Sequence, residues 1–127
     1  MRDWYDAVPL WGRDPRGSSR PPPTESEMIR HIVFFSARRP EDVPAVLQGL
    51  SILATIPHAR RVEVALNAKA DQIGNDVDVV VYGEFDDAAA LAAYKAHPLY
   101  EESIRRVRPL RDVRMAADYV VETAVTG

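Results

Sequence analysis

The hydrophobic positions of the chain change their period several times after residue 28, which is typical of alternating strands and helices. The segment Ile29–Ser36 is short and rich in β-branched and aromatic residues, so it predicts a strand. From Pro40 to about Pro57, apolar residues at helical spacing predict an amphipathic helix. Strict alternation of apolar and polar residues over Arg60–Asn67 then predicts a second strand.

The second half of the chain repeats this alternation. The almost continuous apolar run Val77–Phe85 predicts a third strand, which is a central one because both its faces are apolar. An alanine-rich helix is expected next, capped by Asp86 or Asp87, and Pro98 separates it from a second helical piece. The last strand is expected over Arg111–Glu122.

The element order is therefore βαββααβ. Right-handed crossovers turn this order into a four-stranded antiparallel sheet with the helices on one face, the ferredoxin-like α+β architecture. The last strand has apolar residues on both of its sides, so the bare face of the sheet needs a cover. A second copy of the chain is the simplest cover, and the sequence predicts a homodimer that closes two sheets into an α/β barrel.

The first 27 residues differ from the rest in composition. Residues 12–27 are rich in glycine, serine, proline and charge, which predicts a linker. Before the linker lies a short apolar cluster that contains Trp4 and Trp11. Two interpretations stay open: residues 1–27 are a dispensable extension of a domain formed by residues 28–127, or they are an arm that docks on that domain.

Fluorescence separates these two interpretations, because the chain has two tryptophans and both lie in the arm. We expect the native protein to emit at shorter wavelength than indole in water, since a docked arm shields both rings. An emission maximum equal to that of water-exposed indole would show that the arm is not docked.

Composition narrows the possible partners. The 127 residues suffice for one domain with a single core, and the absence of cysteine excludes thiol catalysis and thiolate metal sites. A net charge of -3 gives no general attraction to nucleic acid or to an anionic membrane, and no apolar run is long enough to span a bilayer. We expect a cytoplasmic protein with neither nucleic acid nor membrane as a partner.

The chain shows no motif for a metal or a nucleotide. Its three histidines include no pair at the i, i+4 spacing of a helical metal site. There is no glycine-rich phosphate loop and no dinucleotide-binding fingerprint. The sequence therefore predicts no metal site and no cofactor.

One basic cluster stands out, with five arginines in the ten positions Arg105–Arg114. Such a cluster could bind phosphate or an acidic partner. Acidic residues at Glu101, Glu102, Asp112 and Asp118 could instead pair with it. The favoured interpretation is a solvated face with salt bridges.

Several short motifs resemble the stress-responsive A/B barrel (dimeric α/β barrel) family. They are MIRHIVFF at 28–35, GEFDD at 83–87, AYKAHP at 93–98 and the dipeptide Asp118-Tyr119. The resemblance covers about residues 28–122, and the order of the motifs agrees with the topology above. It implies a homodimeric barrel, and it leaves the activity open, because most members of the family have no assigned reaction.

One member, olivetolic acid cyclase, closes a polyketide by aldol chemistry without a cofactor. The resemblance places His31 at its strand histidine and Tyr94 at its helix tyrosine. Its general base, a histidine, corresponds to Tyr100 here. The cyclase activity is therefore not carried over to this chain.

The residues that remain form a candidate ligand-binding site: His31, Tyr94, His97 and Tyr100. Tyr94 and His97 are i, i+3 neighbours, and His31 meets them if its strand packs under that helix. A neutral imidazole beside a phenol can take a proton from an acidic carbon and hydrogen-bond the enolate. His31 and Tyr94 are accordingly the candidate catalytic residues.

Three functions stay open at this point. The first is binding of a small apolar or aromatic molecule between the sheet and the second helix. The second is a cofactor-independent enzyme, cyclase-like or an isomerase, that uses His31 and Tyr94. The third is a purely structural stress-tolerance oligomer. A cavity of about 300 Å³ beside His31 favours the first two, and side chains that fill this space favour the third.

Overall fold

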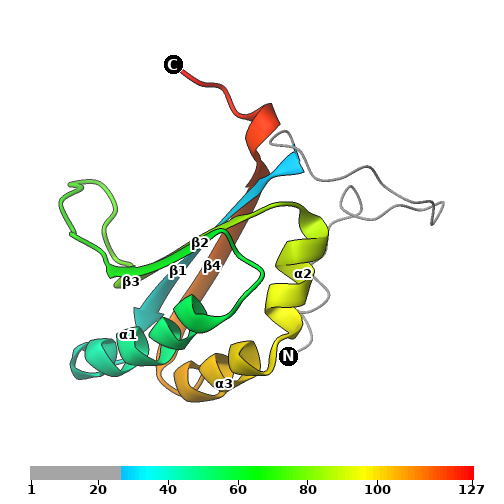
Figure 1. Cartoon of the computed structure of the whole chain (residues 1–127). Coiled ribbons are helices and arrows are strands. Elements are labelled where there is room, and N and C mark those ends of the chain that lie inside the picture. Colours follow the sequence, from blue (N-terminus) through cyan, green and yellow to red (C-terminus); the bar gives the residue numbers. More distant parts are fainter. Residues whose placement is uncertain (1–26) are drawn as a thin grey trace.

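The computed structural model of the protein describes residues 27–127 and confirms the expected order of elements (Figure 1). The arm with Trp4 and Trp11 lies outside the described residues, so its docking and the boundary at residue 28 stay predictions. The strands are β1 (Ile29–Ala37), β2 (Arg61–Leu66), β3 (Val79–Phe85) and β4 (Arg111–Val120). The helices are α1 (Val43–Ser51), α2 (Ala88–Ala96) and α3 (Pro98–Val107). Short 3-10 turns are found at Pro40–Asp42, Ile52–Thr55 and Val121–Thr123.

The four strands form one antiparallel sheet in the order β2-β3-β1-β4. The expected central position of β3 is confirmed, and Figure 1 shows α1, α2 and α3 on one side of the sheet. The strand ends differ from the expected ones by a few residues. The last strand ends at Val120, because Val121–Thr123 form a 3-10 turn that begins where the Val121 N–H donates to the Met28 carbonyl.

The residues that begin the helices explain where α2 and α3 divide. Asp87 caps α2 by accepting a hydrogen bond from the Ala90 N–H at 2.9 Å. His97 has an extended backbone, and its Nδ1 accepts from the Leu99 N–H at 3.1 Å. Pro98 then opens α3 at the position where a helix tolerates proline.

The core lies between the sheet and the helices, where alternate residues of β1 and β3 are buried. Helices α1 and α3 approach each other closely at Gly49, whose carbonyl accepts a hydrogen bond from Ser103 Oγ at 2.9 Å. A methyl group on Gly49 would lie 2.8 Å from the side chain of Val107. The approach of the two helices therefore depends on this glycine.

Gly49→Ala is expected to lower the melting temperature. Overpacking costs about 1–3 kcal/mol and the better helix propensity of alanine returns roughly 1 kcal/mol, so the net loss is about 1 kcal/mol, or about 4–8 °C. Gly74→Ala is the matched control, because nothing lies within 4 Å of its added methyl group. Thermal denaturation followed by circular dichroism measures both, and equal melting temperatures would contradict the close approach.

The other face of the sheet has no helix over it in the described residues 27–127. Successive side chains of a strand point to opposite faces of the sheet. Asp118 pairs with the buried His31 and lies on the helix side, so Met115, three residues earlier in β4, points to the open side. Met115 is 60% exposed. It lies beside Phe34, which in turn pairs with Val80. The described chain thus presents an apolar sheet face to solvent. None of the helices in residues 27–127 has the length and hydrophobicity needed to cross a membrane.

Candidate functional site

A buried histidine–carboxylate pair lies on the helix side of the sheet. His31 in β1 is 2% exposed, and its Nδ1 lies 2.5 Å from Oδ1 of Asp118 in β4. The two residues stand directly opposite each other in the antiparallel pairing, so their side chains leave the sheet on the same face. The side chain of Asp118 is 20% exposed.

The environment sets the protonation of this pair. Burial lowers the pKa of His31, and the hydrogen bond with Asp118 only partly opposes that effect. For Asp118, burial works to raise the pKa, but the hydrogen bond from His31 and nearby positive charges lower it overall. Near pH 7 the imidazole is therefore neutral and the carboxylate is ionised.

This protonation fixes the tautomer of His31. An ionised carboxylate can only accept hydrogen bonds, so Nδ1 of His31 must carry the proton that is donated to Asp118. In a neutral imidazole the second nitrogen then has no hydrogen, and Nε2 offers a lone pair. The pair therefore presents a base.

Stability is expected to fall on acidification, since the folded state holds the pKa of His31 below its ordinary 6.5. The unfolded chain then takes up the proton first, so this stabilisation is complete above pH 6.5 and is lost as the pH falls through the lowered pKa. Melting temperatures at pH 7 and pH 5 should differ less in His31→Gln than in the native chain. The same difference in both would contradict the lowered pKa of His31.

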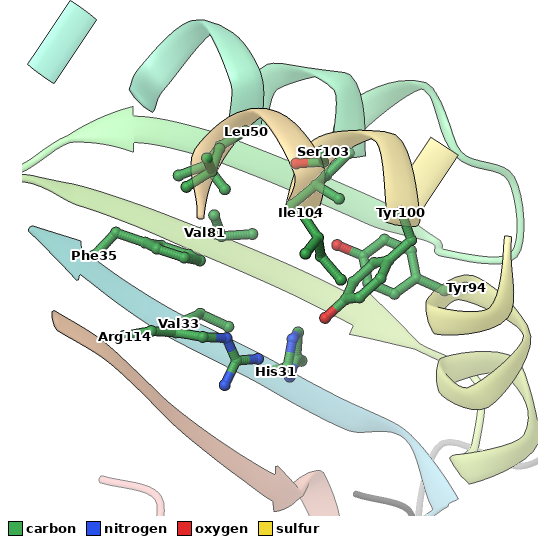
Figure 2. A pocket seen from close by; sticks show the side chains of 12 residues that line it. His31, Val33, Phe35, Leu50, Val81, Tyr94, Tyr100, Ser103, Ile104 and Arg114 are labelled. Carbon is green, nitrogen blue, oxygen red and sulfur yellow. The ribbon is translucent and has the colours of Figure 1, made fainter. Parts of the chain in front are cut away.

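Two tyrosines stand over His31 from the helix side (Figure 2). Tyr94 of α2 has its ring centroid 6.3 Å from that of His31, and Tyr100 of α3 lies 5.3 Å from Tyr94. Burial, followed by the neighbouring Tyr100, raises the pKa of Tyr94, so this side chain stays a neutral phenol. A phenol can donate a hydrogen bond to an oxyanion.

These side chains line a cavity between the sheet and the helices, together with seven apolar residues. The polar residues that line it are His31, Tyr94, Tyr100, Ser103 and Arg114. The space open to the centre of a water molecule is about 10 Å³. That is room for about one water molecule, far below the roughly 300 Å³ of a small-molecule site, because side chains fill most of the volume.

The structure brings together three of the four residues grouped by the sequence analysis. His31, Tyr94 and Tyr100 line one cavity. His97 is not among the lining residues, because α2 ends at Ala96 and the extended backbone of His97 turns its ring toward His58, 6.2 Å away. A ligand-binding role for His97 stays a prediction.

Sequence reasoning did not assign Asp118, Arg114 or Lys95 to the site. Asp118 could have been found from the strand order and the register of β1 with β4, because these place it opposite His31. Lys95 of α2 is 4% exposed, and its charge helps to lower the pKa of Asp118. Within residues 27–127, no three side chains of metal-binding type come together.

The fold and the site define a ferredoxin-like α+β domain with a buried histidine–carboxylate pair under its helices. The chain matches the family described as the stress responsive A/B barrel domain over residues 29–121, and it belongs to that family. The resemblance seen in the sequence is thereby confirmed. The comparison with curated proteins gives no match.

Solved structures share this fold. A Dabb family protein from Mesorhizobium loti is 28% identical, with 73% of this chain and 95% of that chain covered and a TM-score of 0.61. A dimeric protein of unknown function from Bacteroides fragilis is 25% identical, with 74% and 96% covered and a TM-score of 0.61. A hydroxynitrile lyase from Passiflora edulis is 14% identical, with 80% and 99% covered and a TM-score of 0.63. That likeness shows the fold alone.

Proposed function

We propose that this chain is a cofactor-independent enzyme in which His31 is the general base that takes a proton from a carbon of a small bound molecule. The observation that supports this most directly is the 2.5 Å contact between His31 Nδ1 and Asp118 Oδ1 at the wall of a cavity. The contact leaves Nε2 as the basic nitrogen. Burial of the imidazole on a central strand restricts its rotamer, which is the preorganisation that a base requires.

The neighbouring side chains complete the step. The substrate C–H bond breaks, the proton goes to Nε2 of His31, and the electron pair moves onto the substrate oxygen as an enolate. Asp118 stabilises the imidazolium that forms, as a carboxylate does beside a histidine base. Tyr94 or Tyr100 donates a hydrogen bond to the enolate oxygen. Return of the proton to another atom gives an isomerisation, and attack of the enolate on a carbonyl carbon gives an aldol product.

The cavity volume bears on what can bind. Room for one water molecule admits only a small reacting group, so a larger ligand must displace a lining side chain. The same filled volume is the specific observation that favours the second candidate function, a structural oligomer without chemistry. The experiment below decides between the two.

A small carbon acid tests the base directly. Nitroethane in D₂O loses its acidic proton signal in the NMR spectrum when a base removes that proton. We expect the native chain to speed this exchange about 10²-fold or more over His31→Gln, which is the scale of general-base catalysis. His58→Asn is the matched control, because asparagine tolerates the left-handed backbone of His58 and this histidine lies outside the cavity lining. Equal exchange in the native chain and in His31→Gln would overturn the proposal.

We also infer that the active form is a homodimer through the open sheet face. The apolar residues around Met115 and Phe34 support this, because an exposed face of this kind is a common site of association. The Bacteroides fragilis protein, 25% identical, is described as dimeric. Two four-stranded sheets can close into one barrel, and such an interface should exceed about 1,200 Å².

A further inference from the structure

Arg114 occupies a distinct place in the cavity described above. It lies in β4 on the same face as Asp118, with only the small Ala116 between them on that face. Figure 2 shows its guanidinium turned toward His31. Of the twelve lining residues, the other eleven are buried and Arg114 is partly exposed. Arg114 therefore stands where the cavity meets solvent.

The charges around the cavity favour an anion. Among the lining residues in the described part of the chain, Arg114 carries the only full charge, because the histidine is neutral and the tyrosines are phenols. The positive charges of Lys95 and Arg114 also act on the Asp118 carboxylate and help to lower its pKa. A molecule that enters past Arg114 meets positive charge first.

The surrounding arginines extend this positive region. The solvated face expected for the basic cluster is present in one part, since Arg105 and Arg106 both pair with Glu102. In the other part, Arg111 is close enough to Arg114, Arg108 and Arg38 that their charges, after burial, lower its pKa. Arg111 thus lies among three other positive charges, one of which, Arg114, lines the cavity.

We propose that the substrate is a small carboxylate-bearing ketone, whose carboxylate pairs with Arg114 at the cavity mouth while its acidic carbon reaches His31. This inference rests on the proposed function, and it names the class of substrate. A guanidinium matches a carboxylate with two parallel hydrogen bonds.

Pyruvate and methyl pyruvate form a matched pair of probes, because both carry an acidic methyl group beside a carbonyl and only pyruvate is an anion. Deuterium uptake into the methyl group from D₂O is followed by NMR. We expect Arg114→Gln to slow the exchange of pyruvate about tenfold or more relative to that of methyl pyruvate, since a charge-assisted hydrogen bond is worth about 1.5–3 kcal/mol. The ratio of the two rates is the readout, because the charge of Arg114 also helps to lower the pKa of His31 and so affects both probes. Arg114→Lys should keep part of the preference for pyruvate, because it keeps the charge. Arg106→Gln, on the exposed face of α3, is the control for loss of a positive charge.

The outcomes separate this inference from the proposed function. If the native chain exchanges nitroethane faster than His31→Gln does but exchanges neither ketone faster, the ketone assignment is wrong and the proposed function stands. If it exchanges none of the three probes faster, the proposed function fails. If the native chain exchanges both probes and Arg114→Gln slows both equally, Arg114 acts on the developing enolate and the carboxylate assignment is wrong. If Arg114→Gln changes neither rate, Arg114 does not hold the substrate. Melting curves of the variants show whether each one is folded.

Discussion

Met115→Asp is expected to convert a dimer into monomers. Met115 lies in the middle of β4 on the open face of the sheet and is 60% exposed in the single chain. In a symmetric dimer through this face, the substitution places one carboxylate from each copy in the interface. Burying an unpaired charge costs several kcal/mol, more than a dimer of ordinary affinity tolerates.

Light scattering after size exclusion at micromolar concentration measures this effect. The native chain should have twice the 14.2 kDa mass of one chain, and Met115→Asp should have the mass of one chain. Ile73→Asp is the matched control, because Ile73 is 98% exposed in the loop between β2 and β3 and lies outside the sheet. A native chain that scatters as a monomer, or a variant that remains dimeric, would contradict the sheet-face interface.

The sequence was sufficient for the fold because each element has its own hydrophobic period. Alternation over β2 and the helical spacing of α1 are local properties, and the order of elements then leaves few topologies. The ends of elements were less predictable. Val121 continues the apolar pattern of β4, yet its N–H bonds the Met28 carbonyl at the start of a 3-10 turn. That contact depends on tertiary structure.

The candidate site was predictable only in part, for the same reason. Strand and helix positions bring His31, Tyr94 and Tyr100 together, as the order of elements suggests. Asp118 was seen only as a partner for the arginines, since its contact with His31 depends on the register of two strands 87 residues apart. The volume of the cavity depends on how the large side chains pack against one another. The local pattern of hydrophobic residues does not predict this packing.

His31→Ala is expected to lower the stability of the fold as well as to remove the base. The imidazole is 2% exposed, and its removal leaves the partly buried Asp118 carboxylate without its donor. Losing one partner of such a pair costs about 2–4 kcal/mol, which is roughly 10 °C or more in melting temperature for a domain of this size. Calorimetry of His31→Ala and of Asp118→Ala should show a substantial loss in each case.

The double variant His31→Leu/Asp118→Leu shows whether the pair is kept for stability or for chemistry. Replacing both partners of a buried polar pair by apolar side chains of similar volume is often neutral or stabilising, whereas removing one partner is costly. If the pair serves catalysis, the double variant should melt at or above the native temperature and exchange nitroethane no faster than His31→Gln. A double variant as unstable as the single ones would mean that the pair holds β1 and β4 together. This role in stability would then account for the pair without any reaction.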